Sequence, residues 1–260
     1  APLTIWLQGG PGGSSLFGLF SEMGPYSLSP SLGLIGRPSS WNKDYGMLFI
    51  DNPVGAGFSY PDAQDGGPRG YCTNTKQCVA DNLYGLIQGF YKLFPGQLKV
   101  PLFITGESYG GHYVPAFAYK VHTANLALGQ CITDKDCPDS YCQKAGHAGA
   151  PAPRTGMCHG KAVPAGGDQL VPLYGLAVGD GWIDPVNMIG GYPEMMFNFG
   201  LVSMKQKAVI QDYCDRCVAQ IKAGNMTAAF EIWDRVRPRC HSLRALPVLF
   251  FFFLLFSHAF

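Results

Sequence analysis

The stretch FITGESYGG, residues 103–111, places Ser108 between two glycines directly after an apolar run. The apolar residues predict a buried strand, and the residues from Tyr109 onward predict a helix that carries Pro115. Gly-x-Ser-x-Gly at a strand-to-helix turn is typical of a nucleophile elbow, a tight turn that lifts the serine hydroxyl above a sheet. With 34 glycines in 260 residues the pentapeptide alone arises by chance. The flanking elements make Ser108 a candidate nucleophile.

The same alternation of strand and helix extends to both sides of this turn. Short runs rich in Ile, Leu, Val and Phe suit buried parallel strands, and apolar residues at helical spacing lie between them. The predicted strands cover residues 3–7, 47–51, 101–105 and 174–179, and the predicted helices cover residues 81–94 and 109–126. This order favours an α/β fold with a mostly parallel central sheet, helices on both faces and right-handed crossovers.

A second glycine-rich turn, QGGPGGSS at residues 8–15, follows the first predicted strand. Its free amides can point at a developing oxyanion, although a plain Gly-Pro turn is the simpler interpretation. In open α/β sheets the loops at the carboxyl ends of the strands meet at one edge. We therefore expect this loop and the Ser108 turn to form one site.

Composition excludes several classes of function. The net charge is +1 and no long basic run occurs, so the sequence does not predict a nucleic-acid partner. The nine cysteines are interpreted as disulfides of an oxidising compartment, because the Cys-x-x-Cys at 214–217 has no second ligand pair at zinc-finger spacing. Neither a metal site nor a cofactor is predicted. Asn225 begins an Asn-Met-Thr acceptor for glycosylation.

Four ordered blocks resemble the serine carboxypeptidases, and most closely their vitellogenic-like branch. They are WLQGGPGGSSLFGLFSEMGPY, MLFIDNPVGAGFSY, FITGESYGGHYVPA and GLAVGDGWIDPVNMIGGYP. The resemblance covers most of residues 1–126 and 172–236. It implies an α/β-hydrolase fold with the beginning of a helical lid, and a sheet that is incomplete at both flanks.

The resemblance also implies roles for residues of the two turns. Ser108 would be the nucleophile, and the amides of Gly10 and Tyr109 would form the oxyanion hole.

The resemblance also implies that three residues recognise the substrate. Glu107, Gln8 and the amide of Gly9 would bind the terminal carboxylate of a peptide. Two carboxyl groups share a site only when one is protonated, so such an enzyme should prefer acidic pH. The family more often has Asn where this chain has Gln8, and often a cysteine where this chain has Gly13. Both differences match the vitellogenic-like branch.

We expect five segments along the chain. They are a core at 1–126, a cysteine-rich surface insertion at 127–170, a core strand and loop at 171–185, a helical lid at 186–240 and an apolar tail at 241–260. The tail is too short to cross a bilayer comfortably, so no firm membrane anchor is predicted. Because the sequence opens inside a strand pattern at Ala1, we expect it to be a fragment.

The partners that Ser108 needs are not evident. A hydrolase triad runs in the order Ser, Asp or Glu, then His, each on a loop after a later strand. None of the later histidines has that setting: His112, His122, His147, His159, His241 and His258. We expect the triad Asp and His to be absent from this chain and the chain to be nearly inactive as written.

The resulting hypothesis is a serine-type carboxypeptidase of the secretory route, lysosomal, vacuolar or extracellular, that releases C-terminal residues through an acyl-enzyme on Ser108. Two alternatives stay open. One is a carboxypeptidase-like acyltransferase, because the same nucleophile serves both outcomes. The other is a non-catalytic product that binds peptides or a protein partner.

Overall fold

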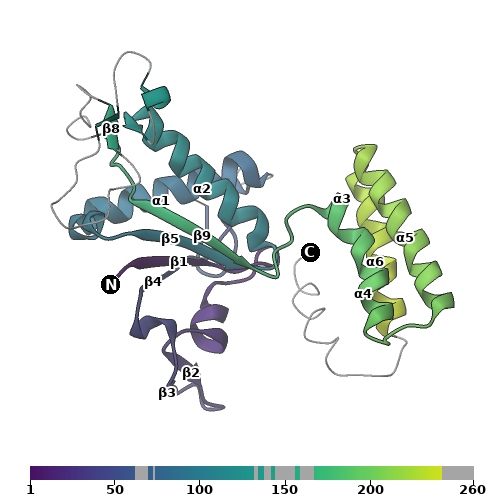
Figure 1. Cartoon of the computed structure of the whole chain (residues 1–260). Coiled ribbons are helices and arrows are strands. Elements are labelled where there is room, and N and C mark those ends of the chain that lie inside the picture. Colours follow the sequence, from purple (N-terminus) through teal and green to yellow (C-terminus); the bar gives the residue numbers. More distant parts are fainter. Residues whose placement is uncertain are drawn as a thin grey trace. The chain divides into compact units, whose positions relative to one another are not determined.

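A computed structural model of the chain divides into two compact units, residues 1–181 and 182–260. Figure 1 shows the strands with their covering helices in the first unit and a group of helices in the second. The structure describes residues 1–61, 70–72, 74–131, 134–137, 142–143, 156–158 and 167–241. Side chains of residues 236–241 are outside this description.

A four-stranded parallel sheet forms the centre of the first unit, in the order β4-β1-β5-β9. The four predicted strands are confirmed, with ends that differ from the prediction by at most two residues. They are β1 (Leu3–Leu7), β4 (Gly46–Phe49), β5 (Leu102–Glu107) and β9 (Leu173–Gly179). Ile5 of β1 pairs with Ile104 of β5, which sets the register of the two central strands.

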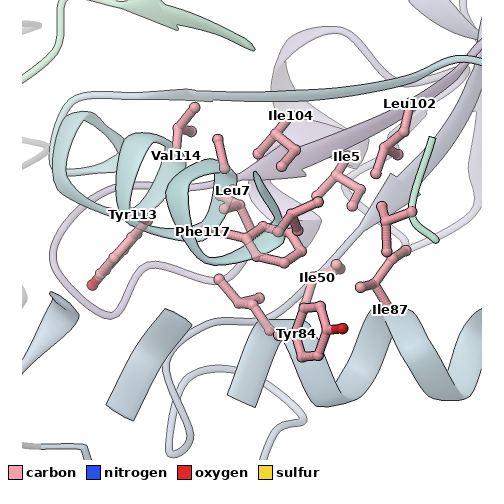
Figure 2. Packing of buried hydrophobic residues seen from close by; sticks show 14 of the residues in the cluster. Ile5, Leu7, Ile50, Tyr84, Ile87, Leu102, Ile104, Tyr113, Val114 and Phe117 are labelled. Carbon is pink, nitrogen blue, oxygen red and sulfur yellow. The ribbon is translucent and has the colours of Figure 1, made fainter. Parts of the chain in front are cut away.

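Two helices, α1 (Ala80–Leu93) and α2 (Gly110–Ala127), pack on one face of this sheet (Figure 1). They connect β4 to β5 and β5 to β9, and both connections move in the same direction across the sheet. Right-handed crossovers in one direction put their helices on the same face. Figure 2 shows the result, a core in which Ile5 and Ile104 lie beside Phe117 of α2 and Ile87 of α1.

The connection from β1 to β4 moves in the opposite direction and therefore reaches the other face. It holds short helical turns at 18–22 and 41–43 and an antiparallel hairpin, β2 (Tyr26–Leu28) with β3 (Leu34–Gly36). Trp41 packs edge-on against Trp6 of β1 with ring centroids 5.8 Å apart. The sequence did not predict this hairpin, because its strands have only three residues each.

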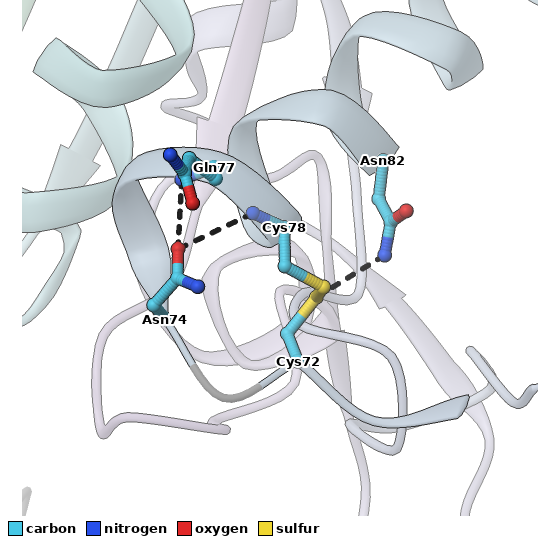
Figure 3. The surroundings of a disulfide bond; sticks show 5 residues. All are labelled: Cys72, Asn74, Gln77, Cys78 and Asn82. Atoms are coloured by element: carbon cyan, nitrogen blue, oxygen red, sulfur yellow. Dashed lines mark hydrogen bonds between the residues drawn. A yellow bond between two sulfur atoms is a disulfide. The ribbon is translucent and has the colours of Figure 1, made fainter. Parts of the chain in front are cut away.

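Six cysteines form disulfides, so the interpretation of these residues as disulfides is confirmed. The pairs are Cys72–Cys78, Cys131–Cys142 and Cys137–Cys158. The first pair precedes α1, where Asn74 Oδ1 accepts hydrogen bonds from the amides of Gln77 at 2.9 Å and Cys78 at 3.4 Å (Figure 3). These contacts cap the helical turn that leads into α1.

The cysteine-rich insertion is described in part. Its strands β6 (Gln130–Cys131), β7 (Cys142–Gln143) and β8 (Gly156–Cys158) form a small antiparallel sheet in the order β6-β8-β7. Two disulfides join this sheet and the turn at Cys137, as expected for a stapled insertion.

The second unit is helical, as the sequence predicted for residues 186–240. Its helices are α3 (Pro185–Met188), α4 (Tyr192–Asn198), α5 (Met204–Lys222) and α6 (Met226–His241). Ser203 and Gln206 form a reciprocal capping box at the start of α5. The predicted role of these helices as a lid stays a prediction.

Within the described part of the chain, no helix is long and apolar enough to cross a membrane. The apolar tail predicted at 241–260 lies outside the described residues, apart from His241 at the end of α6.

Candidate active site

The turn between β5 and α2 holds Ser108 in a strained conformation. Its φ is +54°, a value that side-chain-bearing residues rarely adopt. Gly106 and Gly110 make the turn feasible, because a Cβ atom on them would lie 2.5 Å and 3.0 Å from the carbonyl oxygen of Leu7. The two glycines of the Gly-x-Ser-x-Gly stretch therefore let the turn pack directly on β1. This is the geometry of a nucleophile elbow.

The glycine-rich loop after β1 lies against this turn, as expected for loops at the carboxyl edge of a parallel sheet. A Cβ atom on Gly9 would lie 2.6 Å from the amide nitrogen of Tyr109 and 2.8 Å from Ser108 Cβ. Gly10 has a φ of +116°, which favours glycine. The structure thus brings Gly9 beside Ser108 and the Tyr109 amide.

The elbow helix also holds this loop. Tyr113 of α2 is buried, which raises the pKa of its phenol, and a backbone hydrogen bond from Gly12 acts in the opposite direction. Inside the loop, the Gly13 amide donates to the Gly9 carbonyl at 2.9 Å.

Gln8 and Glu107 are joined by a hydrogen bond beside Ser108. Trp6 Nε1 donates to Gln8 Oε1 at 2.8 Å, and because an indole nitrogen can only donate, this contact fixes the orientation of the amide. Gln8 Nε2 then donates to Glu107 Oε1 at 2.6 Å. Gln8 is buried, and these two hydrogen bonds hold its side-chain amide in place.

Glu22 belongs to the same cluster, although the sequence assigned it no role. The pKa of Glu22 is raised to about 8, first by burial and next by contact with the Glu107 carboxyl, while a hydrogen bond from the Gln8 side chain opposes the rise. Glu22 Oε2 is buried and has no hydrogen-bond partner among the described residues. The Glu22 carboxyl therefore holds a proton at neutral pH, beside a second acidic side chain.

No local sequence pattern around Glu22 predicts its contact with Glu107. It lies on a short helical turn in the connection from β1 to β4, where Arg37 donates to the backbone carbonyls of Glu22 and Phe20. Only the long-range approach to Glu107 could have identified it.

No side chain that could act as a base contacts the Ser108 hydroxyl in the described part of the chain. Ser108 Oγ is buried and has no hydrogen-bond partner there. His112 follows on α2, where it stacks on Tyr109 with ring centroids 4.7 Å apart, and burial lowers its pKa. The Ser108 amide donates to the Gly179 carbonyl at 3.1 Å and to Asp180 Oδ1 at 3.3 Å. The end of β9 thus supports the backbone of the elbow.

Metal coordination has little support in the described residues. The only group of close potential ligand atoms found there is formed by Cys131, Cys137 and Cys158. All three sulfur atoms are in disulfides and so are not thiolates that could bind a metal.

Comparison with known proteins gives a consistent result. The family model described as "Serine carboxypeptidase" matches residues 1–132. A "Probable serine carboxypeptidase CPVL" from Homo sapiens is 36% identical over 91% of this chain and 40% of its own length. A "Vitellogenic carboxypeptidase" from Aedes aegypti is 34% identical over 88% of this chain and 39% of its own length. The chain therefore spans about 40% of the length of these relatives.

A solved structure shares the fold. The crystal structure of KEX1(DELTA)P, a prohormone-processing carboxypeptidase from Saccharomyces cerevisiae, superposes with a TM-score of 0.64 over 90% of this chain and 44% of that chain. The sequence identity is 24%, so this likeness concerns the fold.

Proposed function

The chain belongs to the serine carboxypeptidase family, and from that membership we propose that it carries the nucleophile and the carboxylate-binding half of a serine-type carboxypeptidase site. The substrates would be peptides or proteins with a free C-terminus. The cluster of Glu22, Glu107 and Gln8 beside Ser108 is the observation that carries this proposal.

Ser108 would attack the carbonyl carbon of the last peptide bond. The bond to the C-terminal amino acid breaks, the serine proton passes through a base to the leaving amine, and water then hydrolyses the acyl-enzyme. The amides of Gly10 and Tyr109 would stabilise the oxyanion. The strained φ of Ser108 and the approach of the glycine-rich loop support these roles.

Recognition of a C-terminal carboxylate would use Glu22, Glu107, Gln8 and the amide of Gly9. A carboxylate is repelled by charged acidic side chains but accepts a hydrogen bond from a protonated one. Glu22, whose pKa is raised to about 8 by burial and by Glu107, supplies such a donor at acidic and neutral pH. We therefore add Glu22 to the site.

A peptide-binding measurement tests this function. A short fluorescent peptide with a free carboxylate should bind the purified chain at pH 5 at least ~10-fold more tightly than the same peptide with a C-terminal amide, because the amide leaves charge-assisted hydrogen bonds unmade. Fluorescence anisotropy measures both affinities. As a control, Gln143→Ala, which lies outside the cluster, should keep the same preference for the free-acid peptide. Equal affinity for the two peptides would refute the carboxylate site.

Residues 1–260 taken alone would be nearly inactive. Among the described residues Ser108 Oγ has no partner that could take its proton. Loss of the base costs about 10⁶ in kcat in a triad enzyme, about as much as loss of the whole triad. This also keeps the second candidate function, peptide binding without catalysis, consistent with the structure.

A fluorophosphonate probe measures this directly. We expect the folded chain to be labelled at Ser108 no faster than background at pH 5 and pH 7, with Ser108→Ala as the background and circular dichroism as the check on folding. Rapid labelling that disappears in Ser108→Ala would show that a base is present after all.

A secretory location is proposed on the three disulfides, which form and persist in oxidising compartments. Asn225 is a proposed glycosylation acceptor. It is exposed at the turn between α5 and α6, where its Oδ1 accepts from the Ala228 amide at 3.1 Å. A glycosidase-sensitive mass increase that persists in Asn225→Gln would refute this assignment.

A further inference from the structure

Asp51 lies at the end of β4 and gathers hydrogen bonds from two separate loops. Its Oδ1 accepts from Ser14 Oγ at 2.6 Å and from the Ser15 amide at 2.8 Å. Its Oδ2 accepts from the Phe58 amide at 2.8 Å. One carboxylate therefore joins the glycine-rich loop after β1 to the loop after β4.

The chain leaves space for this carboxylate at a position where only glycine fits. Gly57 has a φ of +52°, and a Cβ atom there would lie 2.0 Å from Asp51 Oδ2. The Asp51 carbonyl accepts a further hydrogen bond from Ser59 Oγ at 2.6 Å. The loop after β4 is thus wrapped around Asp51 and fixes its side chain.

Ser15 carries the contact from Asp51 back to the candidate site. Ser15 is fully buried, and its hydroxyl donates to the Ile50 carbonyl. Its Oγ also accepts a hydrogen bond from the backbone N–H of Gln8 at 3.1 Å. The residues at the two ends of the glycine-rich loop, Gln8 and Ser15, are consequently held together. Gly9, between them, is the residue that lies against Ser108 and Tyr109.

We infer that Asp51 is a positioning residue, which holds the loop of residues 8–15 against the nucleophile elbow through Ser14 and Ser15. It does not touch the reacting atoms. An ionised carboxylate suits this task because it only accepts hydrogen bonds, and all three groups that reach its two oxygens are donors. The role for peptide binding rests on the proposed function, whereas the effect on the loop does not.

Asp51→Ala should loosen this loop locally. Amide hydrogen exchange followed by mass spectrometry on the full chain should show exchange of residues 8–17 accelerated by about tenfold, because hydrogen bonds to a charged acceptor are lost. Exchange in α1 and in β9 should stay unchanged. The free-acid peptide should bind at least ~10-fold more weakly than to the wild type, while the amide peptide changes little.

Two further variants keep the test decisive. Asp44→Ala removes an exposed carboxylate nearby in the sequence and should match the wild type in both measurements. Asp51→Asn keeps an acceptor for Ser14 and Ser15 but presents an amide NH₂ to the Phe58 amide, so its effects should lie between those of wild type and Asp51→Ala. If Asp51→Ala does not fold, Asp51→Asn and Ser14→Ala are judged by the same measurements.

The possible results separate the two proposals. A wild-type chain that does not distinguish acid from amide peptides would refute the proposed function, and exchange alone would then decide the role of Asp51. Unchanged exchange at residues 8–17 in the Asp51 variants would overturn the positioning role. So would faster exchange spread over the whole first unit, which indicates general destabilisation.

Discussion

Glu22 shows how one buried acidic side chain defines the chemistry of the cluster. Burial is the largest cause of its raised pKa, the Glu107 carboxyl comes next, and Asp180 adds a smaller repulsion. Burial also raises the pKa of Asp180, where the hydrogen bond from the Ser108 amide opposes the change. The raised pKa values of Glu22 and Asp180 favour their protonated forms, which suits the binding of a further carboxylate.

The raised pKa predicts how stability changes with pH. Folded Glu22 keeps its proton up to a pH of about 8, whereas the unfolded chain releases it above about 4.5. The unfolded state therefore binds fewer protons between these values, and the stability of the first unit falls as pH rises from 4.5 to 8. Glu22→Gln, which cannot ionise, should flatten this fall.

Thermal unfolding of wild type and Glu22→Gln at pH 5 and pH 8 measures the effect. Glu194→Gln is a suitable control, because Glu194 is exposed and paired with Lys207 in the second unit. If the melting temperature falls from pH 5 to pH 8 by the same amount in the wild type and in Glu22→Gln, Glu22 is not the cause of the fall.

At the level of elements, the right-handed crossover explains what covers each face of the sheet. The connections through α1 and α2 move one way across the order β4-β1-β5-β9, and the connection from β1 to β4 moves the other way. Glu22 lies on that reverse connection, and Asp51 follows β4, the strand to which the connection leads. Both residues therefore reach the carboxyl edge of the sheet, where Gln8 follows β1 and Ser108 follows β5.

Two glycines of different elements should respond to alanine in opposite ways. Gly89 of α1 is exposed, and a Cβ atom there meets nothing within 4 Å, so Gly89→Ala should stabilise the chain by roughly 0.5–1 kcal/mol through helix propensity. A Cβ atom on Gly106 of β5 would lie 2.5 Å from the Leu7 carbonyl oxygen, so Gly106→Ala should destabilise the chain by ~1–3 kcal/mol.

Urea denaturation of the two variants beside the wild type measures both changes. Gly85→Ala, at an equally open position on α1, should reproduce the result for Gly89. A stable Gly106→Ala variant would mean that the elbow does not pack on β1 as described.

For the whole molecule, the sequence predicted the features that are determined by residues close together in the chain. The four central strands, α1, α2 and the helices α5 and α6 follow from apolar periodicity, and the elbow follows from glycines at its strand-to-helix turn. The sequence also predicts that the glycine-rich loop of residues 8–15 approaches the Ser108 turn, because parallel strands end at the same edge of the sheet.

The parts that were missed depend on contacts between distant residues. The hairpin of β2 and β3 has strands too short for a periodic signal. The roles of Glu22 and Asp51 arise where they meet Glu107 and the serines of another loop. A single sequence gives the types of these residues but not which of them come together.

The pH dependence of peptide binding tests whether a protonated Glu22 lets this cluster accept a C-terminal carboxylate. The affinity of the free-acid peptide should be constant from pH 5 to pH 7 and fall at least ~10-fold by pH 9, as Glu22 ionises at about 8. Glu22→Gln should bind the peptide with little change over this range. If the wild type binds the peptide with the same affinity at pH 5 and pH 9, the proton on Glu22 does not control carboxylate binding.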